Sequence, residues 1–286
     1  MLASKHVPWQ VKVAAKLVLA HIPLNYQIWK HVGILKLGAM ERPEYALGVF
    51  RRHFDDANFA RKSGEFVGLE LGPGDSLDSA VIAKAFGASQ TYLVDIGDFA
   101  SSDLECYRRM EAHLRRSGLQ PPDLTSCKNF ADFQEATSTH YLTHGLESLK
   151  GIPTASVDFI WSHAVLQHVR RNEFFPTLQE LRRIQRPDGL GAHRISISDI
   201  LGGKLNDLRF SERVWESAFM SQSGFYTNRI RYGQLMEMFK DAGFTPEIRK
   251  VTRWPSLPTP REKMSAQFAA LPEDDLCISG FDLYLH

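Results

Sequence analysis

From residue 66 onward, the hydrophobic pattern alternates between short apolar runs and amphipathic stretches with helical spacing. The first run, Phe66–Leu71, is nearly continuous in its apolar residues, which is typical of a strand buried on both faces of a parallel sheet. The alternation predicts right-handed βαβ units and therefore a doubly wound α/β fold. The predicted strands are 66–71, 91–95, 141–143, 156–162, 192–198, 245–254 and 277–285, and the predicted helices between them include 77–86, 103–118, 173–184 and 229–242.

Residues 1–62 show helical spacing without intervening strands, so we expect a helical N-terminal extension, separate from a domain that covers 63–286. Within 7–24, the apolar residues share one helical face, while Lys12 and Lys16 lie on another. This stretch is too polar to span a bilayer and has no small-residue cleavage site. Two interpretations remain: a helix that packs on the protein as part of its core or as a lid, or a peripheral helix on an anionic membrane.

A glycine turn follows the first strand directly. Gly72 and Gly74 allow a sharp turn and the close approach of a ligand, and a strand, glycine turn and helix in this order mark the nucleotide-cofactor end of a doubly wound fold. Leu77 occupies the position where a dinucleotide fingerprint has its third glycine. Glu70 and Asp75 flank the turn; their carboxylates would repel a diphosphate and suit a cationic ligand, which disfavours an NAD-linked dehydrogenase.

This segment resembles motif I of the class I S-adenosylmethionine-dependent methyltransferases, with Ser76 in place of the last glycine. Later segments resemble the same family in order and spacing: the strand that ends at Asp95, the stretch 158–169, and Pro187-Asp188-Gly189 as the turn before the fifth strand. The resemblance covers about residues 63–286. It implies a Rossmann-like methyltransferase fold with seven mostly parallel strands, a terminal hairpin, and S-adenosylmethionine as the cofactor.

The motif positions imply which residues hold the cofactor. Asp95 comes roughly 20 residues after the glycine turn, where a carboxylate reaches the ribose hydroxyls of a nucleoside. The family contacts the adenine at the position of 144–146. The expected cofactor-binding residues are Glu70, Gly72, Gly74, Asp75, Asp95, Gly145, Leu146 and Ser162.

A sugar hydroxyl is a very weak acid, so its methylation benefits from a positioned base. Sugar O-methyltransferases of this class have a His and an Asp near the acceptor oxygen. By this resemblance we expect His168 to be the base and Asp199 to orient it or to bind the hydroxyl; His163 is the next candidate, or a cofactor contact. The alternative for His168 is a structural histidine bonded to a backbone carbonyl.

An insertion at 200–228 interrupts the alternation and is rich in aromatic and polar residues. The family builds acceptor pockets at this point, so Trp215, Tyr226, Asn228 and Arg229 are expected to bind the acceptor. Equally, the aromatic residues could form the core of the insertion, with Asn228 as the cap of the next helix.

Composition narrows the functional classes. The net charge is +1 and no long Lys/Arg cluster occurs, so nucleic acid is not an expected partner. The three cysteines are isolated, which predicts reduced thiols in a cytoplasmic protein without a zinc site or other metal. We expect O-methylation of a sugar or other small hydroxylated acceptor, as in bacterial polysaccharide and secondary-metabolite pathways. Two alternatives remain: C- or N-methylation of a quinone, lipid or amine, and a non-catalytic cofactor-binding module.

Overall fold

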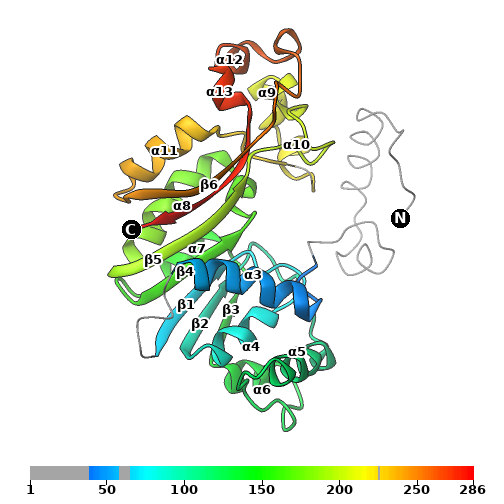
Figure 1. The fold of residues 1–286 in the computed structure, drawn as a ribbon, viewed down its shortest axis with the longest axis vertical. Coiled ribbons are helices and arrows are strands. Elements are labelled where there is room, and N and C mark those ends of the chain that lie inside the picture. The colour runs from blue at the N-terminus through cyan, green and yellow to red at the C-terminus, as the bar shows by residue number, and fades with distance from the viewer. Residues whose placement is uncertain (1–38, 58–64, 225) are drawn as a thin grey trace, which may run out of the picture.

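The computed structural model describes residues 39–57, 65–224 and 226–286. Within these residues a seven-stranded sheet has the order β3-β2-β1-β4-β5-β7-β6 (Figure 1). Neighbouring strands are parallel except that β7 runs antiparallel to both β5 and β6. The prediction of a doubly wound, mostly parallel sheet with a terminal hairpin is confirmed.

The element bounds agree closely with the hydrophobic pattern. The strands are β1 (Phe66–Leu71), β2 (Ala88–Val94), β3 (Thr139–Leu142), β4 (Val157–His163), β5 (Gln185–Ser196), β6 (Pro246–Arg253) and β7 (Ile278–Leu285). The helices are α3 (Pro43–Asp56), α4 (Asp78–Ala85), α5 (Leu104–Arg116), α6 (Phe130–Thr137), α7 (Leu146–Lys150), α8 (Arg171–Ile184), α9 (Glu212–Trp215), α10 (Ala218–Ser221), α11 (Tyr232–Asp241), α12 (Ala266–Ala269) and α13 (Glu273–Leu276), with the short 3₁₀ turns η2 (Leu166–His168), η3 (Asp207–Arg209) and η4 (Arg261–Lys263).

The start of β5 differs from the prediction. The residues 187–189, expected to form a turn before this strand, lie inside it. The pairing between β4 and β5 jumps from Val157–Gln185 to Phe159–Leu190, so the Pro-Asp-Gly segment is a bulge within the ladder. The turn prediction was wrong because β5 pairs with β4 both before and after this segment, so the strand begins ahead of Pro187.

Two hydrophobic cores lie on the two faces of the sheet. One face packs against α3, α4, α5 and α6, and the other against α7, α8 and α11 (Figure 1). The alternation of side chains along β4 serves both cores, because Trp161 faces the first and Ile160 the second.

The helix α3 belongs to the first core, although it precedes residue 62. Phe50 lies 5.3 Å from Trp161 between ring centroids, and Phe54 lies 5.5 Å from Phe159. The expectation that all of residues 1–62 are separate from the sheet therefore does not hold for α3. The predicted helix at 7–24 lies outside the described residues. No described helix is both long enough and apolar enough to cross a bilayer.

A cap, which we define as residues 197–231 and 254–277, gathers at one end of the sheet (Figure 1). The first part contains η3, α9 and α10 and includes the predicted insertion at 200–228. The second part contains η4, α12 and α13, where the sequence predicted only a proline-rich loop before the last strand. Leu205 and Leu208 from the first part share one small core with Met264, Phe268 and Leu276 from the second.

Candidate active site

The glycine turn after β1 has the conformation that only glycine adopts readily. Gly72 and Gly74 have φ values of +69° and +71°. A Cβ atom on Gly72 would lie 2.5 Å from the Cγ2 atom of Val165, so the turn also needs the space that glycine leaves. Both glycines are partly exposed while Pro73 and Asp75 are buried, so the two glycines provide the accessible surface here.

Asp95 follows β2 and contacts this turn. Its Oδ2 atom accepts a hydrogen bond from the backbone N–H of Gly74 at 3.1 Å, and its Oδ1 atom accepts one from that of Ile96 at 2.8 Å. Burial raises the pKa of Asp95, and the two backbone bonds offset part of that effect. The structure therefore places Asp95, the residue expected to bind the ribose, in contact with the glycine turn.

Ile96 is a feature that sequence reasoning missed. Its side chain is 77% exposed, which is unusual for an isoleucine beside a buried strand. Gly145, with φ +51°, donates its N–H to the carbonyl of Asp95 at 2.8 Å, and a Cβ there would lie 3.1 Å from Ile96. Leu146 follows and is partly exposed. These residues form an apolar surface suited to a flat aromatic ring; the available signal was an apolar residue directly after the acidic one.

Glu70 and Asp75, which were expected to place negative charge beside the glycine turn, are both buried. Glu70 is buried and accepts a hydrogen bond from the hydroxyl of Ser79. Burial raises the pKa of Glu70 to about 7, so about half of its charge is lost at neutral pH. Asp75 is also buried. Asp95, by contrast, is a partly exposed carboxylate at the turn.

Ser162 also lies below the surface. It is fully buried, and its hydroxyl pairs with Nδ1 of His193 at 2.8 Å. Burial lowers the pKa of His193 to about 3, so this ring is neutral. The arrangement places Ser162 within the packed sheet, in contrast to the cofactor contact expected from the sequence.

His168 ends η2 and bonds to the cap. Its Nδ1 atom lies 2.8 Å from the carbonyl oxygen of Tyr226. A carbonyl only accepts, so Nδ1 carries the proton of the neutral ring and Nε2 carries the lone pair. The Nε2 atom lies 3.3 Å from the amide nitrogen of Gln167. The residue is exposed, yet removal of water from around the ring lowers its pKa, and the bond to Tyr226 offsets part of this.

Asp199 has other partners than His168. Its Oδ1 atom accepts the N–H of Gly202 at 2.7 Å, and its Oδ2 atom accepts that of Asn206. The side chain is 4% exposed. The expected His168–Asp199 pair is not formed, because the loop between residues 199 and 206 closes around the carboxylate.

Trp215 and Arg229 stabilise the cap from inside. The indole N–H of Trp215 donates to the carbonyl of Thr227 at 2.7 Å. The Arg229 guanidinium carbon lies 5.2 Å from the ring of Trp215 and 5.1 Å from that of Phe268, so the charged group is held between two aromatic rings. Arg229 is 4% exposed. These contacts fit the alternative that the aromatic residues form the core of the insertion.

Asn228 and Tyr226 are engaged in a similar way. The amide nitrogen of Asn228 donates to the carbonyls of Leu166 and Val169 at 2.9 and 3.1 Å, which fastens η2 to the cap. The Tyr226 hydroxyl donates to Glu216 at 2.8 Å. Asn228 does not cap α11, whose N-cap residue is Arg231. An acceptor that bound these side chains would have to replace internal hydrogen bonds.

His163, the last residue of β4, pairs with a residue that the sequence did not suggest. Its Nδ1 atom lies 3.2 Å from Nε2 of His53 in α3, 110 positions earlier. The signal available in the sequence was a histidine on the apolar face of a helix. Among the described residues, no three His, Cys, Asp or Glu side chains are grouped so as to hold a metal ion.

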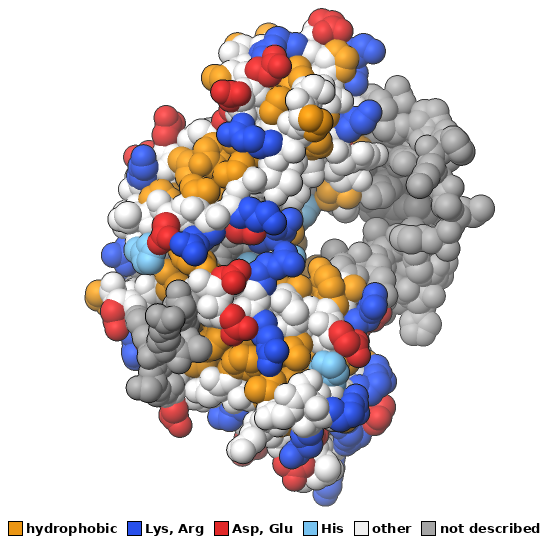
Figure 2. Space-filling model, viewed as in Figure 1, with side chains coloured by type: hydrophobic (Ala, Val, Ile, Leu, Met, Phe, Trp, Pro, Cys, Tyr) orange, Lys and Arg blue, Asp and Glu red, His pale blue; other side chains and the backbone are white. Residues whose placement is uncertain are grey.

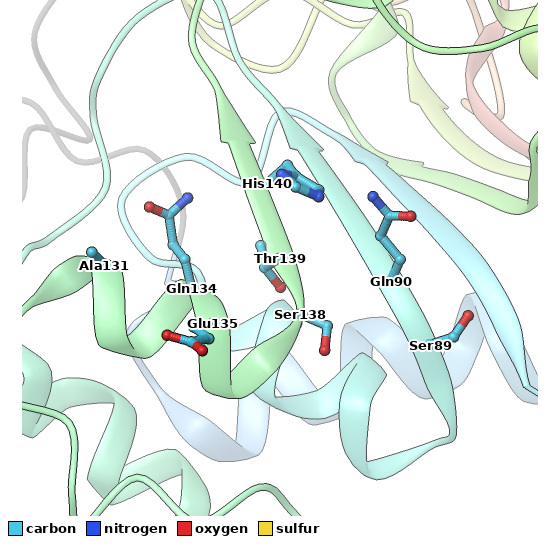
Figure 3. A pocket seen from close by; sticks show the side chains of 8 residues that line it. All are labelled: Ser89, Gln90, Ala131, Gln134, Glu135, Ser138, Thr139 and His140. Atoms are coloured by element: carbon cyan, nitrogen blue, oxygen red, sulfur yellow. The ribbon is translucent and has the colours of Figure 1, made fainter.

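A hollow of about 440 Å³ lies at the opposite edge of the sheet (Figure 3). Its lining comes from α6 and from the first residues of β2 and β3, including Gln134, Gln90 and His140. The glycine turn and Asp95 follow the carboxyl ends of their strands, so this hollow is separate from them.

The fold and the turn define a class of protein. A glycine turn after β1 and a carboxylate that bonds this turn from the end of β2 are typical of the nucleotide-binding end of a doubly wound fold. A family model described as "Methyltransferase domain" matches residues 69–192. Residues 69–192, which carry the glycine turn, Asp95 and His163, match this methyltransferase domain, and the match implies S-adenosylmethionine as the cofactor.

Solved structures resemble the chain at low sequence identity. A methyltransferase from Archaeoglobus fulgidus is 11% identical, with 85% of this chain and 94% of that chain covered and a TM-score of 0.45. One from Methanosarcina mazei is 16% identical, with coverage of 78% and 92% and a TM-score of 0.45. One from Mesorhizobium loti is 16% identical, with coverage of 78% and 92% and a TM-score of 0.42. No curated protein matches the chain.

Proposed function

We propose that the chain transfers a methyl group to a hydroxyl oxygen of a sugar or another small polyhydroxylated acceptor. The observation that carries this proposal is the pair of neutral imidazoles at the carboxyl end of β4: His163 is the last residue of the strand and His168 lies in the following turn η2. Loss of surrounding water lowers the pKa of both rings, so each keeps a lone pair at physiological pH. A weakly acidic hydroxyl needs such a proton acceptor.

We also propose which residues hold the cofactor. S-adenosylmethionine supplies a methyl group on a positively charged sulfur. Asp95 would bind the ribose hydroxyls, Ile96 and Leu146 would cover the adenine, and the backbone of Gly72 and Gly74 would face the remainder. The residues fit this ligand because the glycine backbone is accessible and the exposed Ile96 provides an apolar surface beside a carboxylate.

The cap has a supporting role in this proposal. Asp199 shapes the loop that follows β5 through its two backbone bonds, and Asn228 fastens η2 to the cap. Together they fix the segment from which His168 projects. Trp215 and Arg229 pack inside the cap, so we propose that they stabilise it and do not bind the acceptor.

The test is product analysis with methyl-labelled S-adenosylmethionine and a panel of sugars, lipid-linked sugars, phenols, quinones and amines. We expect label on an oxygen of a hydroxylated acceptor. Label on carbon or nitrogen would favour the alternative methyltransferase classes. Binding of the cofactor without transfer to any acceptor would favour a cofactor-binding module.

We propose a cytoplasmic site of action. The sequence at 7–24 leaves open a peripheral contact with the inner face of the membrane, and methylation of a lipid-linked sugar in the panel would favour that contact.

A further inference from the structure

His163 stands at the level of the glycine turn. Leu71 at the end of β1 pairs with Ser162 of β4, so the residues that follow them, Gly72 and His163, are neighbours across the sheet. Val165 packs against Gly72 in the same region. Asp95 approaches the turn from the other side of β1. A cofactor held at this turn therefore lies between Asp95 and His163.

The two candidate histidines differ in whether a ring nitrogen remains available to accept a proton. Both ring nitrogens of His168 have neighbours within hydrogen-bonding distance, the carbonyl of Tyr226 and the amide of Gln167. His163 is partly exposed, and it makes one hydrogen bond to the part of the chain that the structure describes, through Nδ1. Its Nε2 atom makes none there. His163 is thus the better placed of the two to meet an acceptor.

His53 fixes the His163 ring. The two rings meet edge to face, with centroids 5.4 Å apart and an interplanar angle of 77°. His53 is 5% exposed and held in α3, so its Nε2 atom cannot move far. When Nε2 of His53 accepts the proton on Nδ1 of His163, the lone pair of His163 is left on Nε2.

Burial, together with nearby cationic side chains, keeps both rings neutral. Burial, Arg194 and Arg52 lower the pKa of His163 to about 4, and Asp282 offsets part of this. Burial, His163, His193, Arg52 and Arg194 lower the pKa of His53 well below its usual value. Arg194 forms an ion pair with Asp282 at 3.0 Å. Figure 2 shows basic and acidic side chains side by side at the centre of the face in view.

We infer that His163 accepts the proton of the acceptor hydroxyl and that His53 is its positioning residue, an inference that rests on the proposed function. As the hydroxyl oxygen bonds to the methyl carbon, the carbon–sulfur bond breaks and the hydroxyl proton moves to Nε2 of His163. The products are a methyl ether, a neutral thioether and an imidazolium. The total charge is unchanged, because the positive charge on sulfur disappears as the imidazolium forms, and this loss favours protonation of a ring that is otherwise a weak base.

The first test needs no acceptor. We would follow the ring nitrogens of His163 by NMR as a function of pH, with S-adenosylmethionine and with S-adenosylhomocysteine bound. The positive sulfur beside His163 should lower its titration midpoint by about one pH unit relative to the neutral product. His53→Leu should change the ring nitrogen shifts of His163, and His53→Gln should restore them in part. Equal midpoints in the two complexes, or shifts insensitive to His53→Leu, would overturn the inference.

The second test is kinetic and uses the acceptor found in the panel. His163→Ala should lower kcat by about 10²–10⁴-fold. His53→Leu should lower kcat by at least about tenfold, with the KM values and S-adenosylhomocysteine affinity nearly unchanged, and His53→Gln should recover most of the rate. The matched control is His140→Gln at the opposite edge of the sheet, which should leave the rate unchanged.

The two proposals fail in distinguishable ways. Product formation that survives His163→Ala at the wild-type rate would refute the role of His163 and leave the proposed function intact. Failure of every acceptor would refute the proposed function, whereas the NMR comparison would still decide the placement of His163.

Discussion

Asp78, the first residue of α4, is a fully buried carboxyl group four positions after Gly74. Within the described residues neither of its oxygens accepts a hydrogen bond. Burial raises the pKa of Asp78 to about 8, and Ser76 and Arg109 offset part of this. The folded chain therefore keeps most of this group protonated near neutral pH.

We predict that Asp78→Asn raises the free energy of unfolding in a pH-dependent way. Between about pH 4 and pH 8, Asp78 is ionised in the unfolded chain but protonated in the folded one, so the wild-type protein loses stability as pH rises through this window. The variant lacks this loss. Its advantage should be small near pH 4 and reach a few kcal/mol, as an order of magnitude, at pH 8. Urea unfolding at pH 4.5 and 8 checks this, and an equal difference at both pH values would contradict it.

At the scale of elements, the cap is one packed unit made from two separate segments. Phe268 in α12 lies in the core shared by the two parts and also covers the guanidinium of Arg229. The carbonyl of Leu208, in η3, accepts the N–H of Ser265 at 2.9 Å, which joins the same two parts. Neither Phe268 nor Leu208 belongs to the two cores of the sheet.

Phe268→Ala should therefore loosen the cap and leave the cofactor half intact. Removal of a buried phenylalanine side chain costs about 3–5 kcal/mol locally. We expect faster amide exchange at residues 200–224 and 254–277, with unchanged exchange in β1 and β4 and unchanged affinity for S-adenosylhomocysteine. Val214→Ala, at a side chain that is 47% exposed, is the control and should change neither. Equal loss of protection in β1 would show that the cap and sheet unfold together.

On the scale of the whole molecule, one sheet carries both hydrophobic cores and presents the glycine turn, Asp95 and His163 near its carboxyl edge. These residues come from the ends of three neighbouring strands, β1, β2 and β4. A ligand that binds across these ends joins segments that only the folded state brings together, so its binding stabilises the fold.

S-adenosylhomocysteine at about 100 times its Kd should raise the free energy of unfolding by about 2.7 kcal/mol. For a chain of this size this corresponds to roughly 5–10 °C in Tm. NADH should give no such shift, because the turn lacks the third glycine of a dinucleotide site. Thermal unfolding with each ligand checks this, and stabilisation by NADH alone would contradict the assigned cofactor.

The sequence by itself determined the succession of the seven strands and the glycine turn, and the order and spacing of its motifs indicated the class of cofactor. These features depend on neighbouring residues: apolar periodicity sets each element, and Gly72 and Gly74 set the turn. The bulge in β5 was missed because Pro187 and Gly189 are also typical of a turn before a strand.

Only the tertiary structure decided which polar groups are accessible at the surface and which are buried. Glu70 and Asp75 were predicted to be charged groups beside the turn, but they are buried. Asp199 and Asn228 were predicted to be site residues, but their side chains bond to the backbone. His53 was predicted to lie in a helix separate from the sheet, but it contacts His163 at the end of β4. The physical reason is that burial and side-chain pairing depend on which distant segments pack together, and this information is not contained in the local pattern of any one segment.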